Sequence, residues 1–470
     1  MERWSYVPGA SEQNDNWSFE NEKQVILTVT QAKNLALTER TTHSARITVM
    51  PSYSDVPPIA QASGELDISY GDAGYQLVNP AGMELYEARG IRLTDNNETL
   101  IAGAAPDIAP THTRTQFVLM RRDENGALVE GFGTRGIACG HFEPDEPTWG
   151  SYGEKIFPLR DAKWLLLGFV HNHANMRMPS LAWLHDDGRA DTDSGNNGTF
   201  VLTSPLPGES ASPGTPLVDG DTQSTGFIVT LFQYVDELDY WGSLLSRIEP
   251  NGKLDITFNQ GKQYAETHTR GGEIYDPTAL SHQVDDRILV VGNTDDKRGI
   301  KGGLIKRFDN NGGLDTTFAH NGEYRTQNQR YAHLVCNEES ILVCGATSQG
   351  ALMVKLHADG TPHPDFGGLP VITPQVTAWH KVLIHKGKII AIGVIDGGFS
   401  SQAVLARFER SGEPDMTFGA SKNGRVTLEF GGQFNTVIDL AVDQQERILV
   451  LGSAKGSFGA VNFYIARVFS

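Results

Sequence analysis

A repeated pattern of a turn glycine followed by an aromatic ring constrains this sequence more than any other feature. The copy around Gly312 reads Asn-Gly-Gly-Leu-Asp-Thr-Thr-Phe, and similar runs surround Gly252 and Gly412. In six copies an aromatic residue stands six positions after the turn glycine, and in the remaining copy Ser194 takes its place. The glycines and rings pair as Gly64 and Tyr70, Gly126 and Phe132, Gly252 and Phe258, Gly312 and Phe318, Gly360 and Phe366, and Gly412 and Phe418.

The spacing of the turn glycines predicts the architecture. They fall at positions 64, 126, 188, 252, 312, 360 and 412. Each repeat contains four short runs of strand-forming residues, and no helical period interrupts them. Four antiparallel strands in about 50 to 60 residues, repeated many times, are typical of propeller blades. We therefore predict an all-β fold, a seven-bladed β-propeller of four-stranded antiparallel blades.

The two ends of the repeat region predict that the ring is closed. The last strand-like run, 465–470, stops where the next turn would begin, and Ser63-Gly64 supplies a turn in register. We expect these ends to meet in space. Residues 64–470 then form the propeller, and residues 1–63 form an N-terminal extension with two short strands, at 24–30 and 46–50.

The repeated pattern of an aliphatic-Ala-Arg strand, an Asn-Gly turn and Leu-Asp-x-x-Phe resembles the delta-60 repeat of bacterial proteins, which is regarded as a β-propeller element. The resemblance covers residues 64–470 and is strongest around Gly252, Gly312 and Gly412. It implies a fold and brings no catalytic residues. The copies at Gly188 and Gly360 depart from the pattern, because one lacks the ring and the other has His363 in place of the aspartate. We expect distorted blade junctions there.

Composition excludes several classes of function. A net charge of −18 argues against a nucleic-acid partner, which needs a basic face. Three cysteines are too few for a disulfide framework and fit a reducing compartment. The sequence has no signal-peptide core and no run of about 18 apolar residues, so we expect no membrane span. We predict a cytoplasmic protein, or one released by a signal-peptide-independent route.

Residues that recur in every repeat are expected to be structural. Catalysis needs one asymmetric group of residues, whereas a blade junction needs the same bond in each blade. An Arg or Lys stands five positions before most turn glycines, with Trp183 as the exception, and an Asp follows most turns by three positions. We expect each base to pair with an aspartate, or the aspartate with turn amides, and the rings to pack between blades.

Function is expected on the face of the ring that carries the long connections, at 104–115, 138–154, 171–179 and 201–225. Aromatic residues on these connections and near-by ones, flanked by carboxylates, are suited to stacking on sugars or anchoring a protein partner. The candidate binding residues are Trp149, Tyr152, Tyr234, Tyr240 and Trp241. The competing interpretation is that most of them cover blade edges.

A second group of residues has the chemistry of a metal site. The group comprises Cys139, His141, His171 and His173, and thiolate and imidazole are zinc ligands. Their spacing matches no established zinc motif, and surface histidines are the competing interpretation.

These features leave two functional hypotheses. The favoured one is a non-catalytic binding or scaffold propeller that engages a protein or a glycan through its long-loop face, without a cofactor. The alternative is a metal-dependent lyase or hydrolase, with zinc at the propeller mouth. The oligomeric state and the role of residues 1–63 stay open.

Overall fold

The structure, a computed structural model, describes residues 62–79, 85–109, 112–146, 149–171, 177–202, 210–211, 218–224, 226, 228–235, 241–267, 274–295, 300–455 and 461–470. They belong to one compact unit, Ala62–Ser470. This described part is all-β, apart from the short helical turns α2 (Phe258–Gly261) and η2 (Pro364–Phe366). The predicted extension, with its strands at 24–30 and 46–50, lies outside the described residues.

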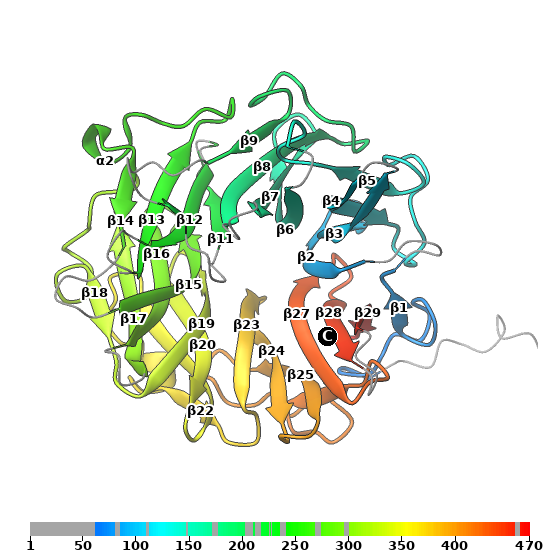
Figure 1. The fold of residues 1–470 in the computed structure, drawn as a ribbon. Helices are drawn as coiled ribbons and strands as arrows, with labels where there is room; N and C mark the ends of the chain where they lie inside the picture. Colours follow the sequence, from blue (N-terminus) through cyan, green and yellow to red (C-terminus); the bar gives the residue numbers. More distant parts are fainter. Residues whose placement is uncertain are drawn as a thin grey trace, which may run out of the picture. The chain divides into compact units, whose positions relative to one another are not determined.

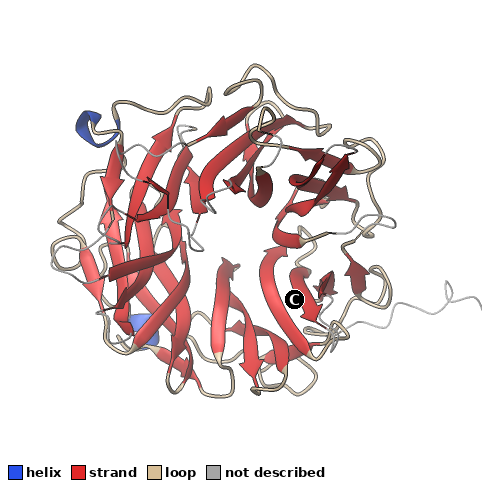
Figure 2. Ribbon diagram, viewed as in Figure 1, coloured by secondary structure: helices blue, strands red, loops and turns tan. Residues whose placement is uncertain are grey.

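The described strands form six sheets, and the first five follow one another along the chain (Figures 1 and 2). Sheet 1 contains β2 (Glu87–Leu93), β3 (Thr99–Ala109), β4 (His112–Arg122) and β5 (Ile137–Gly140). Sheet 2 contains β6 (Gly150–Leu159), β7 (Lys163–His171), β8 (Arg177–His185) and β9 (Thr199–Val201). Sheet 3 contains β10 (Ser210–Ala211), β11 (Val218–Thr222), β12 (Ile228–Val235), β13 (Trp241–Ile248) and β14 (Tyr264–Glu266). Sheet 4 contains β15 (Ile274–His282), β16 (Ile288–Asp295), β17 (Ile300–Phe308) and β18 (Glu323–Arg325). Sheet 5 contains β19 (Gln329–Cys336), β20 (Ser340–Thr347), β21 (Gly350–His357) and β22 (Val371–Thr373).

Sheet 6 has eight strands that fall into two groups of four. The first group is β23 (Ala378–His385), β24 (Lys388–Asp396), β25 (Ser401–Phe408) and β26 (Arg425–Leu428). The second is β27 (Phe434–Val442), β28 (Ile448–Lys455), β29 (Val461–Val468) and β1 (Tyr75–Leu77). A single parallel pair, Ser401 with Phe434, joins the groups, whereas all other strand pairs are antiparallel.

The sheets are arranged around a common centre, as in a β-propeller (Figure 1). The strands nearest the centre are β2, β6, β11, β15, β19, β23 and β27. Apolar clusters fill the space between neighbouring sheets: Leu119 packs with Leu166, and Ile101 of sheet 1 packs with Leu449 of sheet 6. The burial of apolar side chains between neighbouring sheets therefore holds the sheets together.

The ring is closed by the two ends of the described unit, as the sequence predicts. Strand β1 pairs with β29, Leu66 forms a β-bridge with Val468, and the Gly64 amide donates to the Phe469 carbonyl at 2.7 Å. The outermost strand of the last sheet thus comes from the start of the unit. Each of the other sheets also takes its outermost strand from the repeat that follows, so sequence repeats and sheets are offset by one strand.

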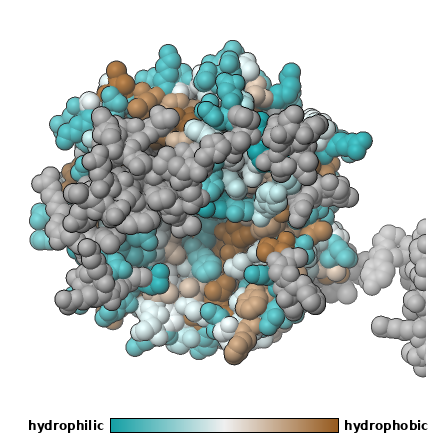
Figure 3. Space-filling view, viewed as in Figure 1, coloured by the Kyte–Doolittle hydropathy of each residue, from teal (hydrophilic) through white to brown (hydrophobic). Residues whose placement is uncertain are grey.

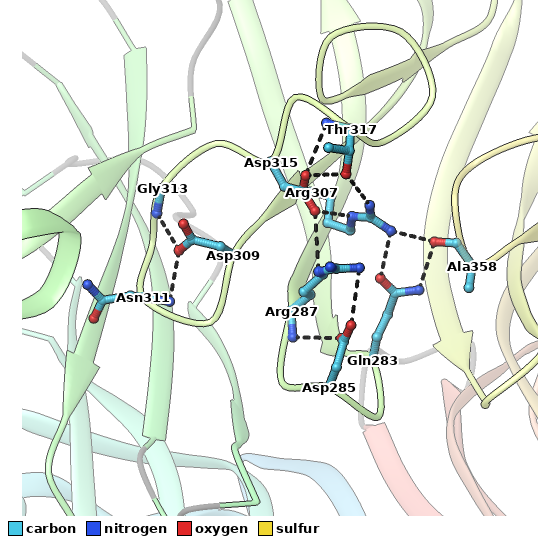
Figure 4. A network of polar contacts seen from close by, with 10 residues as sticks. All are labelled: Gln283, Asp285, Arg287, Arg307, Asp309, Asn311, Gly313, Asp315, Thr317 and Ala358. Carbon is cyan, nitrogen blue, oxygen red and sulfur yellow. Dashed lines mark hydrogen bonds and ion pairs between the residues drawn. The ribbon is translucent and has the colours of Figure 1, made fainter.

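A recurring set of contacts, here called the latch, joins neighbouring repeats. In the Gly312 copy, Arg307 Nε donates to Asp315 Oδ2 at 2.9 Å, and the guanidinium also donates to the Ala358 carbonyl of the next turn (Figure 4). The guanidinium lies 4.8 Å from the centre of the Phe318 ring. The same base–aspartate bond joins Arg247 to Asp255 at 2.7 Å. The predicted base–aspartate pairing is confirmed, and the aspartates serve structure.

The atypical copies keep a latch by other means. Lys163 replaces the missing base and bonds Asp191 at 2.7 Å, and the Gly195 amide still donates to the next repeat at 2.9 Å. The expected distortion is therefore absent at the Gly188 junction. In the Gly360 copy, Lys355 bonds Asp365 at 2.6 Å, and His363 caps the 3-10 turn η2. That junction does depart from the regular turn.

One expected loop is instead part of a sheet. Residues 104–109 and 112–115 belong to the long β3–β4 hairpin, whose pairing continues to Ala109 and His112. Strand-forming residues such as Ile108 and Thr113 allow the ladder to extend beyond the sheet core. The expected loop 201–225 likewise contains β10 and β11 of sheet 3, whereas 138–154 includes the connection from β5 to β6. That connection lies at the end of the ring where β3 meets β4. We call this the long-loop end, and the opposite one the turn end.

We expect Gly312→Ala to destabilise the protein more than Gly387→Ala. Both glycines have left-handed backbones, with φ of 88° and 78°, so either alanine is strained by roughly 1 kcal/mol. A Cβ at Gly312 would also lie 2.5 Å from Phe258 Cζ, whereas nothing lies within 4 Å of one at Gly387. Overpacking should add about 1–3 kcal/mol, measured by urea unfolding. Equal losses would contradict the role of the ring–glycine contact.

Lowering the pH should selectively remove the contribution of Asp365 to the free energy of unfolding. Burial acts to raise the pKa of this carboxyl, but hydrogen bonds from Lys355 and Arg410 outweigh it and lower the pKa to about 2. Because the folded pKa lies below the unfolded one of about 3.9, the stabilisation is present above that value and is lost as the pH falls towards 2. Asp365→Asn should be less stable than the wild type at pH 5, and the difference in urea midpoint should close near pH 2. An equal difference at both pH values would argue against this ion pair.

Candidate functional site

The residues proposed as zinc ligands lie on two different sheets. Cys139 is in β5, His141 follows it, and His171 ends β7, whereas His173 lies outside the described residues. His141 Nε2 lies 2.9 Å from Asp107 Oδ2. Although Cys139 keeps an exposed surface, desolvation of its thiol and the nearby Asp107 carboxylate raise the pKa of the thiol to about 11. A thiol held neutral at pH 7 is a poor zinc ligand.

Within the described part of the chain, no three His, Cys, Asp or Glu side chains are grouped so that they could hold a metal ion. Zinc binding stays a prediction of the sequence.

The predicted binding aromatics also differ in their surroundings. Trp149 packs against the core between sheets 1 and 2, and its Nε1 is buried. Tyr152, near the start of β6, is partly exposed. Tyr234 and Trp241 have described backbones at the long-loop end of β12 and β13, and Tyr240 lies outside the described residues. Among these residues, Tyr152 is the one whose described side chain lies at the surface beside charged groups.

Tyr152 belongs to a cluster of aromatic and basic side chains around Phe169. The Tyr152 ring stacks on Phe169 with centroids 4.8 Å apart and planes 10° from parallel, and its hydroxyl lies 3.4 Å from Thr115 Oγ1. Strand pairing sets this arrangement, because Tyr152 is directly opposite Phe169. His171, two residues further along β7, presents its ring edge to Tyr152 at 6.4 Å.

Two guanidinium groups lie against the same buried ring. Arg177, at the start of β8, lies 4.6 Å from the Phe169 centroid, and Arg89, from β2 of sheet 1, lies 5.5 Å from it. The cluster therefore draws on β2, β6, β7 and β8 at the long-loop end. Cation–π contacts on a ring that is only 1% exposed hold both groups in place.

Arg89 is fully engaged with carboxylates. It donates to Glu154 at 2.7 Å and also pairs with Glu87. Burial acts to lower the pKa of Arg89, but Glu154 and Glu87 outweigh it and raise the pKa. Arg89 therefore ties sheet 1 to sheet 2 and pairs with both carboxylates, whose combined charge its single positive charge offsets in part.

Sequence reasoning identified Tyr152 and His171 but missed Arg89, Phe169 and Arg177. The signal that could have identified them is the β7–β8 hairpin. In this hairpin Phe169 pairs with Pro179, and Arg177 stands two residues before Pro179 on β8. The direction in which each side chain points depends on this register, which the sequence leaves open.

Two clefts occupy the turn end instead, and both lie at repeats that lack the regular aspartate. A cleft of about 530 Å³ between sheets 1 and 2 is lined by Val129, which stands at the aspartate position. Another of about 340 Å³, between sheets 5 and 6, is lined by Lys355 and Arg410. The arginines and the lysine here are already paired, Arg121 with Glu98, Arg189 with Asp187, and Lys355 and Arg410 with Asp365, so we assign these clefts no ligand.

Among the residues that Figure 3 colours, hydrophilic ones are frequent at the rim, and hydrophobic and hydrophilic residues adjoin near the middle of the ring. Among the described residues there is no helix with the length and apolarity needed to cross a bilayer.

Fold and strand pairing define a propeller-like all-β protein, and comparison with known proteins adds no family. No protein-family model matches the sequence, and no curated protein matches it. Solved structures with similar folds include a glucose dehydrogenase, at 10% identity and a TM-score of 0.39 over 83% of this chain and 99% of the other. A polysaccharide lyase, the PL25 ulvan lyase, matches at 9% identity and a TM-score of 0.45, with 82% and 96% coverage. Drosophila Semaphorin 2a matches at 7% identity and a TM-score of 0.44, with 84% and 75% coverage. These likenesses are too distant to transfer an activity.

Proposed function

We propose that this protein is a non-catalytic, seven-bladed β-propeller of delta-60-type repeats that binds a glycan at the long-loop end of sheet 2. The seven blades are sheets 1 to 5 and the two four-strand groups of sheet 6. The single parallel pair between those groups supports treating them as separate blades, since each group has its own antiparallel meander.

The cluster of Tyr152, Phe169, Arg177 and His171 carries the proposal of binding. It combines a partly exposed phenol, a partly exposed guanidinium and an imidazole on strands that hold them rigidly. Carbohydrate sites use aromatic surface together with planar hydrogen-bonding groups. Rigid strands keep such groups in place without a large entropic cost on binding.

A glycan is favoured over a protein at this place because the apolar component of the cluster is buried. The centre of a protein interface needs exposed apolar or aromatic anchors. Phe169 is only 1% exposed, and the accessible atoms of the cluster belong to polar side chains. Exposed apolar residues are found elsewhere, for example Phe399 at 88%.

A glycan array with the purified protein tests this function. Tyr152→Ala should weaken binding of any glycan found on the array by roughly tenfold, because it removes the stacked phenol. Tyr324→Ala is the matched control, since Tyr324 is a partly buried tyrosine on sheet 4. Binding that tolerates Tyr152→Ala, or an array without a hit accompanied by a specific protein partner, would refute the proposed site.

A further inference from the structure

Arg177 differs from other buried and half-buried arginines because its guanidinium has no hydrogen-bond or ion-pair partner among the described residues. Its Nε is buried and makes no hydrogen bond. Within the described residues its guanidinium lies over the face of Phe169, with Cζ 4.6 Å from the ring centroid. The Nε of Arg122 is also buried without a partner, but its other guanidinium nitrogens donate to three backbone carbonyls, and Arg447 bonds Asp443 at 2.6 Å.

Leaving a guanidinium partly desolvated without a partner is costly. A buried donor that is not hydrogen-bonded loses its interactions with water and gains nothing in exchange. The protein as a whole has abundant carboxylates, with a net charge of −18, yet no described one bonds Arg177 Nε. Such a group is typical of a site whose partner is supplied from outside.

The orientation of Arg177 is fixed before any ligand arrives. Stacking on Phe169 and the pairing of Arg177 with His171 at the start of β8 restrict the side chain. Arginine presents a planar fork that matches the two oxygens of a carboxylate or sulfate. Neighbouring Glu87 and Glu154 compete little for it, because both are paired with Arg89.

We propose that Arg177 binds an acidic group, a carboxylate or a sulfate, on the glycan recognised at the long-loop end of sheet 2. This inference rests on the proposed function and specifies the class of its ligand as acidic oligosaccharides. The Tyr152 phenol, which stacks on the Phe169 ring, provides the sugar-facing surface of the same cluster. A sugar is favoured over an acidic peptide because the cluster has no exposed apolar pocket for peptide side chains.

Calorimetric titration with matched probes tests the inference. The probes are oligogalacturonides and their methyl-esterified forms, dextran sulfate and dextran, and poly-glutamate. We expect an acidic sugar to bind and its neutral counterpart to bind at least about tenfold more weakly. The carboxylate and sulfate arms identify which acidic group is preferred.

Variants assign the effect to the guanidinium. Arg177→Gln should weaken binding of the acidic sugar by about tenfold or more, and Arg177→Lys should also weaken it because lysine lacks the planar fork. Arg189→Gln, at a side chain that is 78% exposed on the turn end, removes the same charge and should leave the affinity unchanged. Melting temperatures of all variants establish that they are folded.

The outcomes separate this inference from the proposed function. An unchanged affinity in Arg177→Gln, equal binding of esterified and acidic sugars, or an Arg177-dependent preference for poly-glutamate would each overturn it. If neutral sugars bind in a Tyr152-dependent manner, the proposed function holds and the acidic specificity is wrong. If no sugar of either kind binds, both are wrong.

Discussion

Replacing Arg467 by alanine is expected to lower the free energy of unfolding by about 3–5 kcal/mol, because the buried Asp67 carboxylate loses the nearer of its two arginine partners. Arg467 is 2% exposed, and its Nε donates to Asp67 Oδ2 at 2.7 Å. It also donates to the Glu124 carbonyl and lies 4.5 Å from the Tyr70 ring. One side chain thus joins the last strand, the first turn and the second turn of the ring. Urea unfolding of the Arg467→Ala variant measures the loss.

A surface arginine provides the control for this experiment. Arg325 pairs with Glu323 and is 43% exposed, so Arg325→Ala should cost at most about 1 kcal/mol. The Asp67→Ala variant and the double variant complete a mutant cycle, in which the two single losses should not add. If Arg467→Ala lowers the free energy of unfolding no more than Arg325→Ala does, the contact of Arg467 with Asp67 contributes little to stability.

Replacing Trp183 by alanine is expected to cost about 3–5 kcal/mol, since a large buried ring is removed from between two repeats. Trp183 stands where the other repeats have a base, and Ser194 stands where they have a ring. A Cβ added at Gly252 would lie 3.0 Å from Trp183 Cη2, as one added at Gly188 would lie 3.0 Å from Phe132 Cζ. Trp183 therefore occupies the space that the missing ring leaves.

This exchange of positions predicts a rescue. Adding Ser194→Phe to Trp183→Ala should restore about 1–2 kcal/mol, because the phenylalanine can occupy the vacated space beneath Gly252. In the wild-type background the same Ser194→Phe change should destabilise the protein by overpacking. Calorimetric unfolding of the four proteins compares them directly. Ser194→Phe effects of the same sign in both backgrounds would contradict the exchange.

Much of the fold was predictable because the same kinds of turn, ring and base residues recur along the chain and form the same local interactions. Turn glycines, rings and bases at fixed spacing predicted the sheets, the pairing of Arg307 with Asp315 and the meeting of the two ends. The strand order within a sheet was less accessible. The sequence of a repeat does not show whether its first strand pairs within that repeat or with the preceding repeat. In the structure it pairs with the preceding repeat.

The candidate site was less predictable because it depends on differences between repeats. Tyr152 was recognisable as an aromatic residue on a long connection. The significance of Arg177 lies in the lack of a partner among the described residues, where Glu87 and Glu154 pair with Arg89 instead. The length of the β3–β4 hairpin was also underestimated, since the 104–115 run has no turn glycine at the point where the sheet core ends.

The one-strand offset between repeats and sheets bears on how such rings change in evolution. Because every repeat donates its first strand to the preceding sheet, gene duplication or deletion of one whole repeat leaves each surviving sheet complete. The pairing of β29 with β1, which closes the ring, follows the same one-strand offset. It therefore needs no new interface when a repeat is gained or lost. A lineage can therefore vary the circumference of the ring by unequal recombination alone, while substitutions in single repeats create the chemical individuality of a binding site.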